Sequence, residues 1–315
     1  MSVKITVIGA GSVGAAITND IMIQGIASEV VLIDINKEKA IGEAMDVYPG
    51  APFCRPAIIR SGDYADAVDS QIVIITSGVP RKPGQSRLEL AQTNVNILKQ
   101  ITPEIVKYAP NAVYIIVSNP VDILTYVFTK ISGLPEHQII GSGTVLDTSR
   151  LQAELAKRFA ISPKNVHAHV YGEHGDTSFV PWSLAHITNT KISDYCKYVT
   201  NTSRIRWDGN FEAVEEFVKT SGAQVIKAKG ATFYAVAMSV CHICKCILHG
   251  AGTALTVSTM MHGEYGIEDV CLSSLALVGK HGVEAKVNTP LTEEEMEKMR
   301  LSAQKLRSII DGLTF

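Results

Sequence analysis

Short runs of apolar, often β-branched residues alternate with stretches of helical periodicity along the first half of the chain. Continuous apolar runs are typical of strands buried on both faces, and helices between them favour a parallel sheet covered on both sides. The predicted strands cover residues 4–11, 29–35, 57–60, 71–78, 112–120 and 138–143. The predicted helices cover 37–47, 89–108 with a kink near Pro103, and 121–131, and a further helical pattern runs through Ile17, Ile21 and Met22. This half therefore predicts a doubly wound α/β sheet.

The pattern changes near residue 144, where the predicted helices become longer. These helices cover 146–160, 211–229, 231–249 and 292–311, and strands are predicted at 166–172, 254–261 and 270–278. Thr292 and Glu295 have the spacing of a capping box, which predicts where the last helix begins. We therefore place a domain boundary near residue 143, with a parallel α/β domain over 1–143 and an α+β domain over 144–315. No flexible linker marks this boundary.

The composition is that of a globular protein with a sizeable core, since 46% of the 315 residues are hydrophobic. A formal net charge of −2 gives no bulk attraction to nucleic acid or to an anionic membrane, so neither partner is expected. The N-terminus lacks the features of a signal peptide, and no window approaches the roughly 20 apolar residues of a membrane span. The six cysteines are expected to be free thiols in a reducing compartment, which makes the cytoplasm the expected location.

Gly9, Gly11 and Gly14 form a GxGxxG turn between the first predicted strand and the helix that follows it. In this context the first glycine permits a tight turn, the second lets backbone approach a pyrophosphate, and the third allows close helix–strand packing. Asp34 ends the next strand, where its carboxylate would accept ribose hydroxyls and repel a 2′-phosphate. The pattern predicts a Rossmann-type site for NAD in preference to NADP. The alternative is a glycine-rich turn in another Rossmann-like fold.

Three further polar stretches stand out against the apolar pattern. His174 lies in VYGEHGDTS, directly after an apolar run, and histidine suits proton transfer near neutral pH. Asp147 and Arg150, in GSGTVLDTSRLQ, share one face if residues 146–160 are helical. Asn119, in VSNPVD, stands at a strand exit, on the edge of the sheet where ligands bind. Taken alone, each has an ordinary interpretation: a structural histidine, a surface ion pair and a common strand exit.

The loop SGVPRKPGQSR, residues 77–87, carries Arg81 and Arg87 together with Gly78 and Gly84. One interpretation is a solvated basic loop. The other is a mobile lid, in which the glycines permit movement and closure brings positive charge onto an anionic substrate while water is expelled. The loop by itself does not decide between the two.

Taken together and in order, these motifs resemble the L-lactate/L-malate dehydrogenase family over essentially the whole chain. The matching stretches are GAGSVG, VVLIDI, SGVPRKPGQSR, VSNPVD, GSGTVLDTSR, GEHGDTS and KGATFYAVAMS. GEHGD combined with LDxxR and the GxSR loop is a highly specific set. The resemblance implies a Rossmann-type domain followed by an α+β catalytic domain, NAD as the cofactor, a small 2-oxo or 2-hydroxy acid as the substrate, and a homotetramer or a dimer.

The resemblance also implies a role for each polar residue. His174 is expected to be the general acid and base, with Asp147 hydrogen-bonded to its other ring nitrogen. Arg150 is expected to grip the substrate carboxylate as a bidentate fork, and Arg87 to stabilise charge developing on the substrate oxygen. The remaining expected substrate-binding residues are Arg81, Asn119 and Thr232, and the expected cofactor-binding residues are Gly9, Gly11, Gly14, Asp34, Gly78, Asn119, Ser142 and Val236. No metal site is expected.

Arg81 bears on the choice of substrate. In this family, arginine at its position is typical of malate dehydrogenases, where it pairs with the second carboxylate of oxaloacetate, and glutamine is typical of lactate dehydrogenases. Thr232 and the continuation SRLELAQTN are instead typical of the lactate type. A hydrated arginine over a methyl group costs little, whereas an unpaired buried carboxylate is strongly destabilising. We therefore expect L-lactate dehydrogenase activity, with malate dehydrogenase or mixed specificity as the alternative.

Two alternatives come from other classes of protein. One is a metal-dependent glycosidase of shared NAD-binding ancestry, for which the thiol-rich tract CHICKC, residues 241–246, is the candidate metal site. Buried free cysteines in a core helix are the better interpretation of that tract. The other alternative is a catalytically silent NAD-binding protein.

Activation by fructose 1,6-bisphosphate, known for many bacterial lactate dehydrogenases, uses two further positions in this family. They are an arginine two residues after the carboxylate-binding arginine and a histidine seven before the catalytic one. Here these positions hold Gln152 and His167. Glutamine has neither the charge nor the fork of arginine, so we expect activation to be weak or absent.

Overall fold

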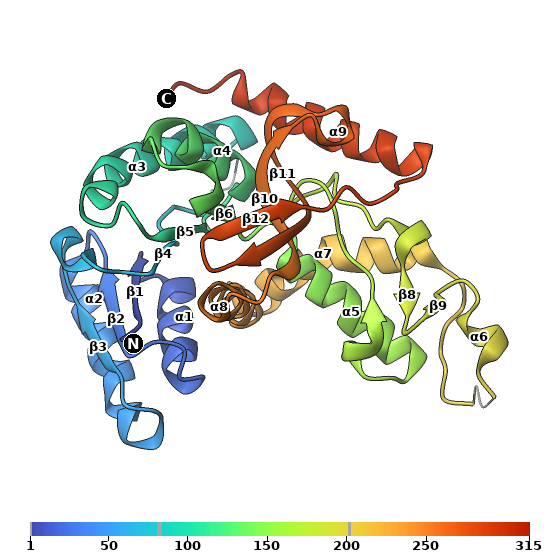
Figure 1. Ribbon diagram of the computed structural model, residues 1–315, viewed down its shortest axis with the longest axis horizontal. Helices are drawn as coiled ribbons and strands as arrows, with labels where there is room; N and C mark the ends of the chain where they lie inside the picture. The colour runs from blue at the N-terminus through green and yellow to red at the C-terminus, as the bar shows by residue number, and fades with distance from the viewer. Residues whose placement is uncertain (1, 81–83, 201–202) are drawn as a thin grey trace.

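The computed structural model describes residues 2–80, 84–200 and 203–315, and within these ranges the chain builds a nine-stranded sheet with helices on both faces (Figure 1). The strand order is β12–β11–β10–β6–β5–β4–β1–β2–β3. The six strands from the first half are mutually parallel: β1 (Lys4–Ile8), β2 (Glu29–Ile33), β3 (Ile58–Ser61), β4 (Ile72–Ile75), β5 (Val113–Ile116) and β6 (Ile139–Gly141). The predicted Rossmann-type doubly wound parallel sheet is therefore confirmed.

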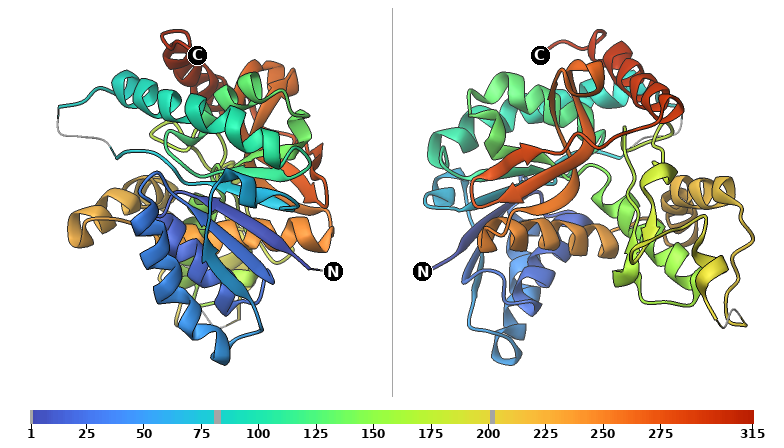
Figure 2. Two further views of the ribbon diagram at one scale, coloured as in Figure 1. Left: turned by 90° about the vertical axis from the view of Figure 1, so that its left-hand side faces the viewer. Right: turned by 45° about the vertical axis from the view of Figure 1, so that its right-hand side comes forward.

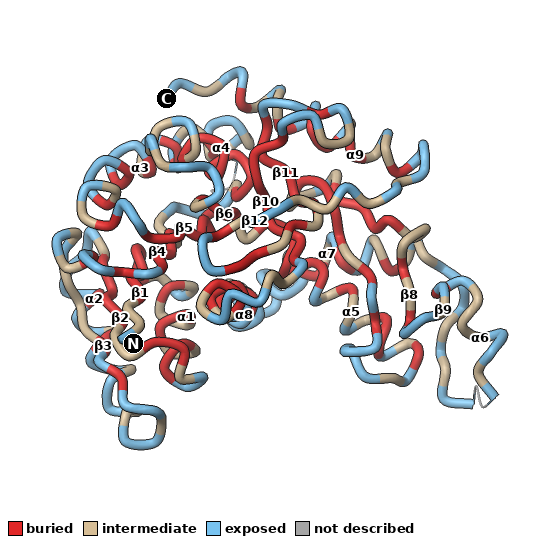
Figure 3. The backbone as a smooth tube through the Cα atoms, in the orientation of Figure 1, coloured by how far each residue is buried: buried red, intermediate tan, exposed pale blue. Residues whose placement is uncertain are grey.

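Successive residues of a strand point to opposite faces of the sheet, so they pack against different helices. In β4, Ile72 and Ile74 join one core cluster, whereas Val73 and Ile75 join another on the opposite face. The first cluster packs against α1 (Ser12–Ile23), α2 (Lys37–Val47) and α8 (Tyr234–His249). The second packs against α3 (Arg87–Tyr108), α4 (Val121–Ser132) and α9 (Glu293–Ile310). The central strands β4 and β5 are buried throughout because both faces are covered, whereas the edge strand β3 is partly exposed (Figure 3).

The second half extends the sheet with antiparallel strands. These are β10 (Thr253–His262), β11 (Glu268–Gly279) and β12 (Gly282–Lys286). Ser258 of β10 pairs with Gly141 of β6, so the sheet crosses the predicted boundary near residue 143. The boundary thus separates two stretches of chain but not two sheets. The predicted strands at 254–261 and 270–278 are confirmed, and β12 was missed because it is short and mostly polar or exposed.

The rest of the second half forms a separate lobe beside the sheet (Figure 2). It contains α5 (Val145–Phe159), α6 (Tyr195–Tyr198) and α7 (Phe211–Lys229), with a small sheet of β7 (Val166–His167), β8 (His186–Ile187) and β9 (Thr190–Lys191). The predicted strand over 166–172 was too long, since beyond His167 the chain makes only isolated bridges at Tyr171 and Gly172. Short 3-10 turns connect the elements: η1 (Tyr48–Phe53), η2 (Tyr64–Ala67), η3 (Glu136–Gln138), η4 (Pro163–Asn165), η5 (Trp182–Leu184) and η6 (Glu264–Gly266).

Side-chain caps define where two of the long helices begin. Ser86 Oγ accepts from Glu89 N at 3.1 Å while Ser86 N donates to Glu89 Oε2 at 2.8 Å, so α3 starts at Arg87 rather than at residue 89. The capping box predicted from Thr292 and Glu295 is present at the start of α9. Helix α3 runs as one helix through Pro103, and α8 begins at Tyr234 rather than at 231.

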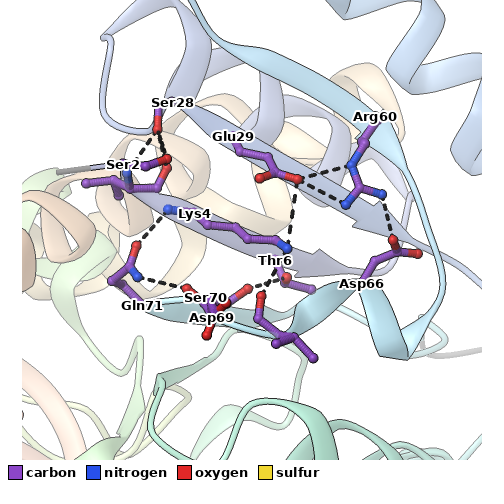
Figure 4. A network of polar contacts seen from close by, with 12 residues as sticks. Ser2, Lys4, Thr6, Ser28, Glu29, Arg60, Asp66, Asp69, Ser70 and Gln71 are labelled. Carbon is purple, nitrogen blue, oxygen red and sulfur yellow. Dashed lines mark hydrogen bonds and ion pairs between the residues drawn. The ribbon is translucent and has the colours of Figure 1, made fainter.

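A polar network ties together the first strands near their amino ends (Figure 4). The Arg60 guanidinium donates to Glu29 Oε1 at 3.1 Å and to Asp66 Oδ1 at 2.8 Å, while Lys4 Nζ donates to the Val68 carbonyl oxygen at 3.0 Å. Lys4 and Glu29 are the first residues of β1 and β2. The network therefore lies away from the carboxyl ends of the parallel strands, where ligands bind in sheets of this type.

Candidate active site

The glycine turn after β1 has the geometry that a bound pyrophosphate requires. Gly9 has a φ of 108°, and a Cβ on Gly14 would lie 1.8 Å from the Gly9 carbonyl oxygen, so neither position tolerates a side chain. A Cβ on Gly11 would meet no atom within 4 Å, which leaves this side of the turn open to a ligand. Helix α1 begins at Ser12, and its N-terminus favours an anion there. These residues fit a dinucleotide.

The Asp34 carboxylate is held at the end of β2 by two main-chain groups. Its Oδ2 accepts from Ala10 N at 2.6 Å, and its Oδ1 accepts from Asn36 N at 2.8 Å. Each carboxylate oxygen has two lone pairs, so the group can still accept ribose hydroxyls while its orientation is fixed. Asp34 and the glycine turn therefore belong to one site.

A cavity of about 320 Å³ opens between the carboxyl edge of the sheet and the second lobe. Seven of the residues singled out in the sequence line it: Asn119, Ser142, Asp147, Arg150, His174, Thr232 and Val236. Helix α7 adds Lys219, Gly222 and Ile226, which no sequence motif had indicated. The other described candidates do not line this cavity: Gly9, Gly11, Gly14, Asp34, Gly78 and Arg87.

His174, Asp147 and Arg150 form a connected group on the cavity wall. His174 Nδ1 lies 2.5 Å from Asp147 Oδ2, and Arg150 Nη1 donates to Asp147 Oδ1 at 3.0 Å. Helix α5 places Asp147 and Arg150 one turn apart on the same face, while His174 comes from the loop after β7. One carboxylate thus orients both a proton-transfer group and a cation that can hold an anionic substrate.

Electrostatics in this group favours the charged forms. The negative charge of Asp147 raises the pKa of His174 to about 9, against the opposing effect of burial. Burial would raise the pKa of Asp147, but the charges and hydrogen bonds of His174 and Arg150 hold it below its usual value. At neutral pH the histidine is therefore a protonated acid beside an ionised aspartate.

Arg87 is the first residue of α3, not part of a free loop. Its guanidinium pairs with Asp176, and its Nη1 lies 3.6 Å from Glu173 Oε1, so it contacts the residues that flank His174. Gly84 has a φ of 79°, a conformation that favours glycine. Arg81 lies outside the described residues. The structure thus brings Arg87 to the loop of His174, although not into the cavity lining.

Asn94 connects the loop after β4 to the exit of β5. Its Oδ1 accepts from Val79 N at 2.9 Å, and its Nδ2 donates to the Asn119 carbonyl oxygen at 2.7 Å. A Cβ on Gly78 would lie 3.3 Å from Asn94 Oδ1, so Asn94 packs closely against this glycine. Asn94 was not predicted from the sequence, although an asparagine among the apolar positions of a long helix was a usable signal.

The thiol-rich tract lies inside α8. Cys241, Cys244 and Cys246 are buried, and burial raises the pKa of Cys241 to about 12 and holds that of Cys244 well above its usual value. Within the described ranges, no group of three or more His, Cys, Asp and Glu side chains is arranged to hold a metal ion. These thiols therefore belong to the core.

The two positions considered for a bisphosphate lie in the second lobe. Gln152 Nε2 donates to the Ala168 carbonyl oxygen at 3.2 Å, while His167 is exposed on β7. The Gln152 amide is thus engaged with the main chain, and the expectation of weak activation stays a prediction.

A glycine turn and an acidic residue at the carboxyl edge of a parallel sheet, next to a cavity with a paired histidine and arginine, define a dinucleotide-dependent dehydrogenase. Two family models match consecutive parts of the chain. The one described as lactate/malate dehydrogenase, NAD binding domain, matches residues 3–141, and the one described as lactate/malate dehydrogenase, alpha/beta C-terminal domain, matches residues 144–314. The chain belongs to the lactate/malate dehydrogenase family, and NAD is its cofactor.

Relatives and solved structures match nearly the full length. L-lactate dehydrogenase 1 of Clostridium acetobutylicum is 46% identical over 311 residues, 98% of each chain. An L-lactate dehydrogenase of Clostridium botulinum (strain Loch Maree / Type A3) is 47% identical over 310 residues, 98% of this chain and 96% of the relative. MGS-M5, a lactate dehydrogenase from a Medee basin deep-sea metagenome library, superposes with a TM-score of 0.94 at 37% identity, covering 98% of both chains. The minor L-lactate dehydrogenase of Enterococcus mundtii has a TM-score of 0.93 at 36% identity, covering 99% of this chain and 98% of that one.

Proposed function

We propose that this protein is an L-lactate dehydrogenase that interconverts pyruvate and NADH with L-lactate and NAD. The group formed by His174, Asp147 and Arg150 carries the proposal, because a proton donor and a carboxylate anchor share one buried aspartate. The names of the relatives at 46% and 47% identity support the same substrate. The test is NADH oxidation with pyruvate and with oxaloacetate, measured side by side. If neither pyruvate nor oxaloacetate is reduced, the proposal is contradicted.

When bound, the nicotinamide supplies or accepts the hydride, and the protein provides orientation, charge and exclusion of water. Arg150 holds the substrate carboxylate as a fork. In reduction, the free ring nitrogen of His174 donates its proton to the substrate carbonyl oxygen, while Asp147 keeps Nδ1 protonated and fixes the ring. Arg87, held beside this loop by Asp176, supplies positive charge to the developing oxyanion when it exchanges that carboxylate for the substrate. The reverse reaction uses the same groups in the opposite order.

The protonation of His174 should set the pH dependence. Reduction requires the protonated ring, so kcat/KM for pyruvate is expected to fall as pH rises through about 9. Oxidation requires the neutral ring, so kcat/KM for L-lactate is expected to rise over the same range. Initial rates from neutral to alkaline pH would measure both limbs. Parallel changes in the two directions would contradict this assignment.

Arg81 is proposed to control the choice between monocarboxylate and dicarboxylate substrates, and malate dehydrogenase activity is the second candidate function. Arg81→Gln is expected to lower kcat/KM for oxaloacetate about tenfold or more, the worth of one charge-assisted hydrogen bond, and to leave pyruvate equal or improved. Lys82→Gln, which removes the neighbouring charge, is the control. An equal loss with both substrates would assign Arg81 to loop closure or folding instead.

Asp34 is proposed to select NAD over NADP. Asp34→Ser is expected to narrow the preference for NAD, because it removes a ribose acceptor and a charge that repels a 2′-phosphate. Asp34→Asn, which keeps a carbonyl acceptor for Ala10 N, separates the effect of the charge from that of the hydrogen bond. The ratio of kcat/KM for NADH and NADPH is the measurement. If that ratio does not change, discrimination lies elsewhere in the site.

We further infer a homotetramer or a dimer. Apolar side chains project into solvent from α2 and η1, where Met45 is 69% and Phe53 90% exposed, and from α8, where Tyr234 is 68% and Met238 63% exposed. Apolar groups clustered on a surface are typical of subunit interfaces. Light scattering that shows a monomer would contradict this inference.

The cytoplasm is the proposed location. Its support is that the cysteines, all within the described residues, are free thiols. In the described part of the chain, no helix has the length and apolar character to cross a membrane.

A further inference from the structure

Asp122 is a buried carboxylate that contacts the candidate acid from behind. It is the second residue of α4 and is 2% exposed. Its Oδ2 accepts from the main-chain N–H of His174 at 2.8 Å, although 52 residues separate the two in the sequence. The histidine is therefore held twice, at its ring by Asp147 of α5 and at its backbone by Asp122 of α4.

A neutral acceptor would be enough for the hydrogen bond with the His174 N–H, so this bond alone does not account for the charge of Asp122. Its Oδ1 makes no hydrogen bond of normal geometry with any described residue, although the Ser258 hydroxyl lies close enough to favour the charged form of the carboxyl. Burial raises the pKa of Asp122 to about 6, while Ser258 and His174 oppose that rise. An asparagine would satisfy the same N–H without the cost of burying a charge. A carboxylate at this place is understandable if its charge acts on the histidine.

The charged groups around His174 are arranged so that Asp122 can favour protonation of its ring. The charged groups around it are Asp147 and Arg150 on α5, Asp122 on α4, Glu173 and Asp176 in its own loop, and Lys219 of α7, which lines the same cavity. Arg150 opposes protonation of the ring, whereas Asp147 and Asp122 favour it. Asp176 and Glu173 are both engaged by Arg87. Asp122 is thus a second carboxylate that can stabilise the imidazolium without contacting the substrate cavity.

We propose that Asp122 is a positioning residue for the reaction: it holds the main chain of His174 and, with Asp147, stabilises the imidazolium that donates the proton. The inference rests on the proposed function in that it takes His174 as the acid. Helix α4 then contributes to the reaction through Asp122, in addition to the contribution expected from Asn119 at the strand exit before this helix. Asp122 acts through His174 and does not touch the reacting atoms.

Two substitutions separate the charge from the hydrogen bond. Asp122→Asn keeps an acceptor for His174 N and removes the charge. The His174 ring is expected to titrate about one pH unit lower, at the low end of the effect of a nearby opposite charge. The alkaline limb of kcat/KM for pyruvate is expected to move with it. Asp122→Ala removes both, and kcat is expected to fall about 10- to 100-fold because the histidine is displaced.

The ring titration is followed by NMR on protein without substrate, so it does not depend on which acid is reduced. Asp66→Asn, which removes a carboxylate from the Arg60 network of Figure 4, is the matched control and should leave the titration unchanged. If Asp122→Asn folds and binds NADH but leaves the His174 titration and the rate profile unchanged, the proposal is overturned, whatever happens to the melting temperature. If the titration moves while the parent protein does not reduce pyruvate, the substrate assignment fails and the role of Asp122 stands.

Discussion

Replacement of His174 by asparagine is expected to lower kcat for pyruvate reduction at least 100-fold, about the low end of general acid–base effects. Asparagine cannot donate a proton at neutral pH, and the pairing with Asp147 at 2.5 Å would lose its charged partner. NADH affinity should change little, because the glycine turn and Asp34 lie on other elements. Initial rates and fluorescence titration with NADH measure the two effects separately.

His281→Asn is a suitable control, since His281 is an exposed histidine that does not line the active-site cavity. Its turnover should equal that of the parent protein. A loss of less than about 100-fold in His174→Asn, with intact NADH binding, would remove His174 from the role of acid.

Replacement of Arg150 by lysine is expected to lower kcat/KM for pyruvate roughly 30-fold or more, although the charge is kept. This corresponds to a loss of about 2 kcal/mol or more in transition-state stabilisation. Lysine has no planar fork and cannot pair with a carboxylate through two parallel hydrogen bonds. It would also lose the geometry of the 3.0 Å bond to Asp147, which links the anchor to the proton donor. Most of the loss should appear in KM, because the substrate carboxylate is bound in both ground state and transition state.

Arg158→Lys on the same helix provides the matched control. Arg158 is partly buried and pairs with Glu154 at 2.8 Å, one turn away, but it does not line the cavity. This variant should keep the parent values of kcat and KM. An equal effect of both substitutions would indicate damage to α5 rather than loss of a substrate contact.

Much of the fold could be predicted from the sequence because the parallel strands carry an unusually clear pattern. Ile72, Val73, Ile74 and Ile75 are all buried, which requires both faces of the sheet to be covered, and the helical patterns between the strands supply the cover. The antiparallel extension was harder to predict from the sequence, since β12 exposes part of its surface and pairs with β11 across a two-residue turn at Lys280 and His281. That β10 joins β6 depends on a contact between distant parts of the chain.

For the candidate site, the glycine turn and Asp34 were predictable, because a local strand–turn–helix pattern contains the geometry that an anion needs. Arg87 was placed in a loop by its proline- and glycine-rich surroundings, yet the capping box formed by Ser86 makes it the first residue of α3. Asn94 and Asp122 were missed as functional positions because both act through main-chain groups of residues far along the chain.

The sequence by itself determined the class of fold, the dinucleotide motif and the residue types needed for proton transfer and carboxylate binding. These follow from local order, since periodicity and short motifs depend on neighbouring residues. The family resemblance had already implied the pairing of His174 with Asp147. Only the tertiary structure decided that Arg150 binds the other oxygen of that carboxylate, and that a second carboxylate, Asp122, reaches the backbone of the same histidine. The physical reason is that His174 comes from a loop, while its two aspartates come from α4 and α5. Their distances depend on how sheet and second lobe pack, which no local pattern encodes.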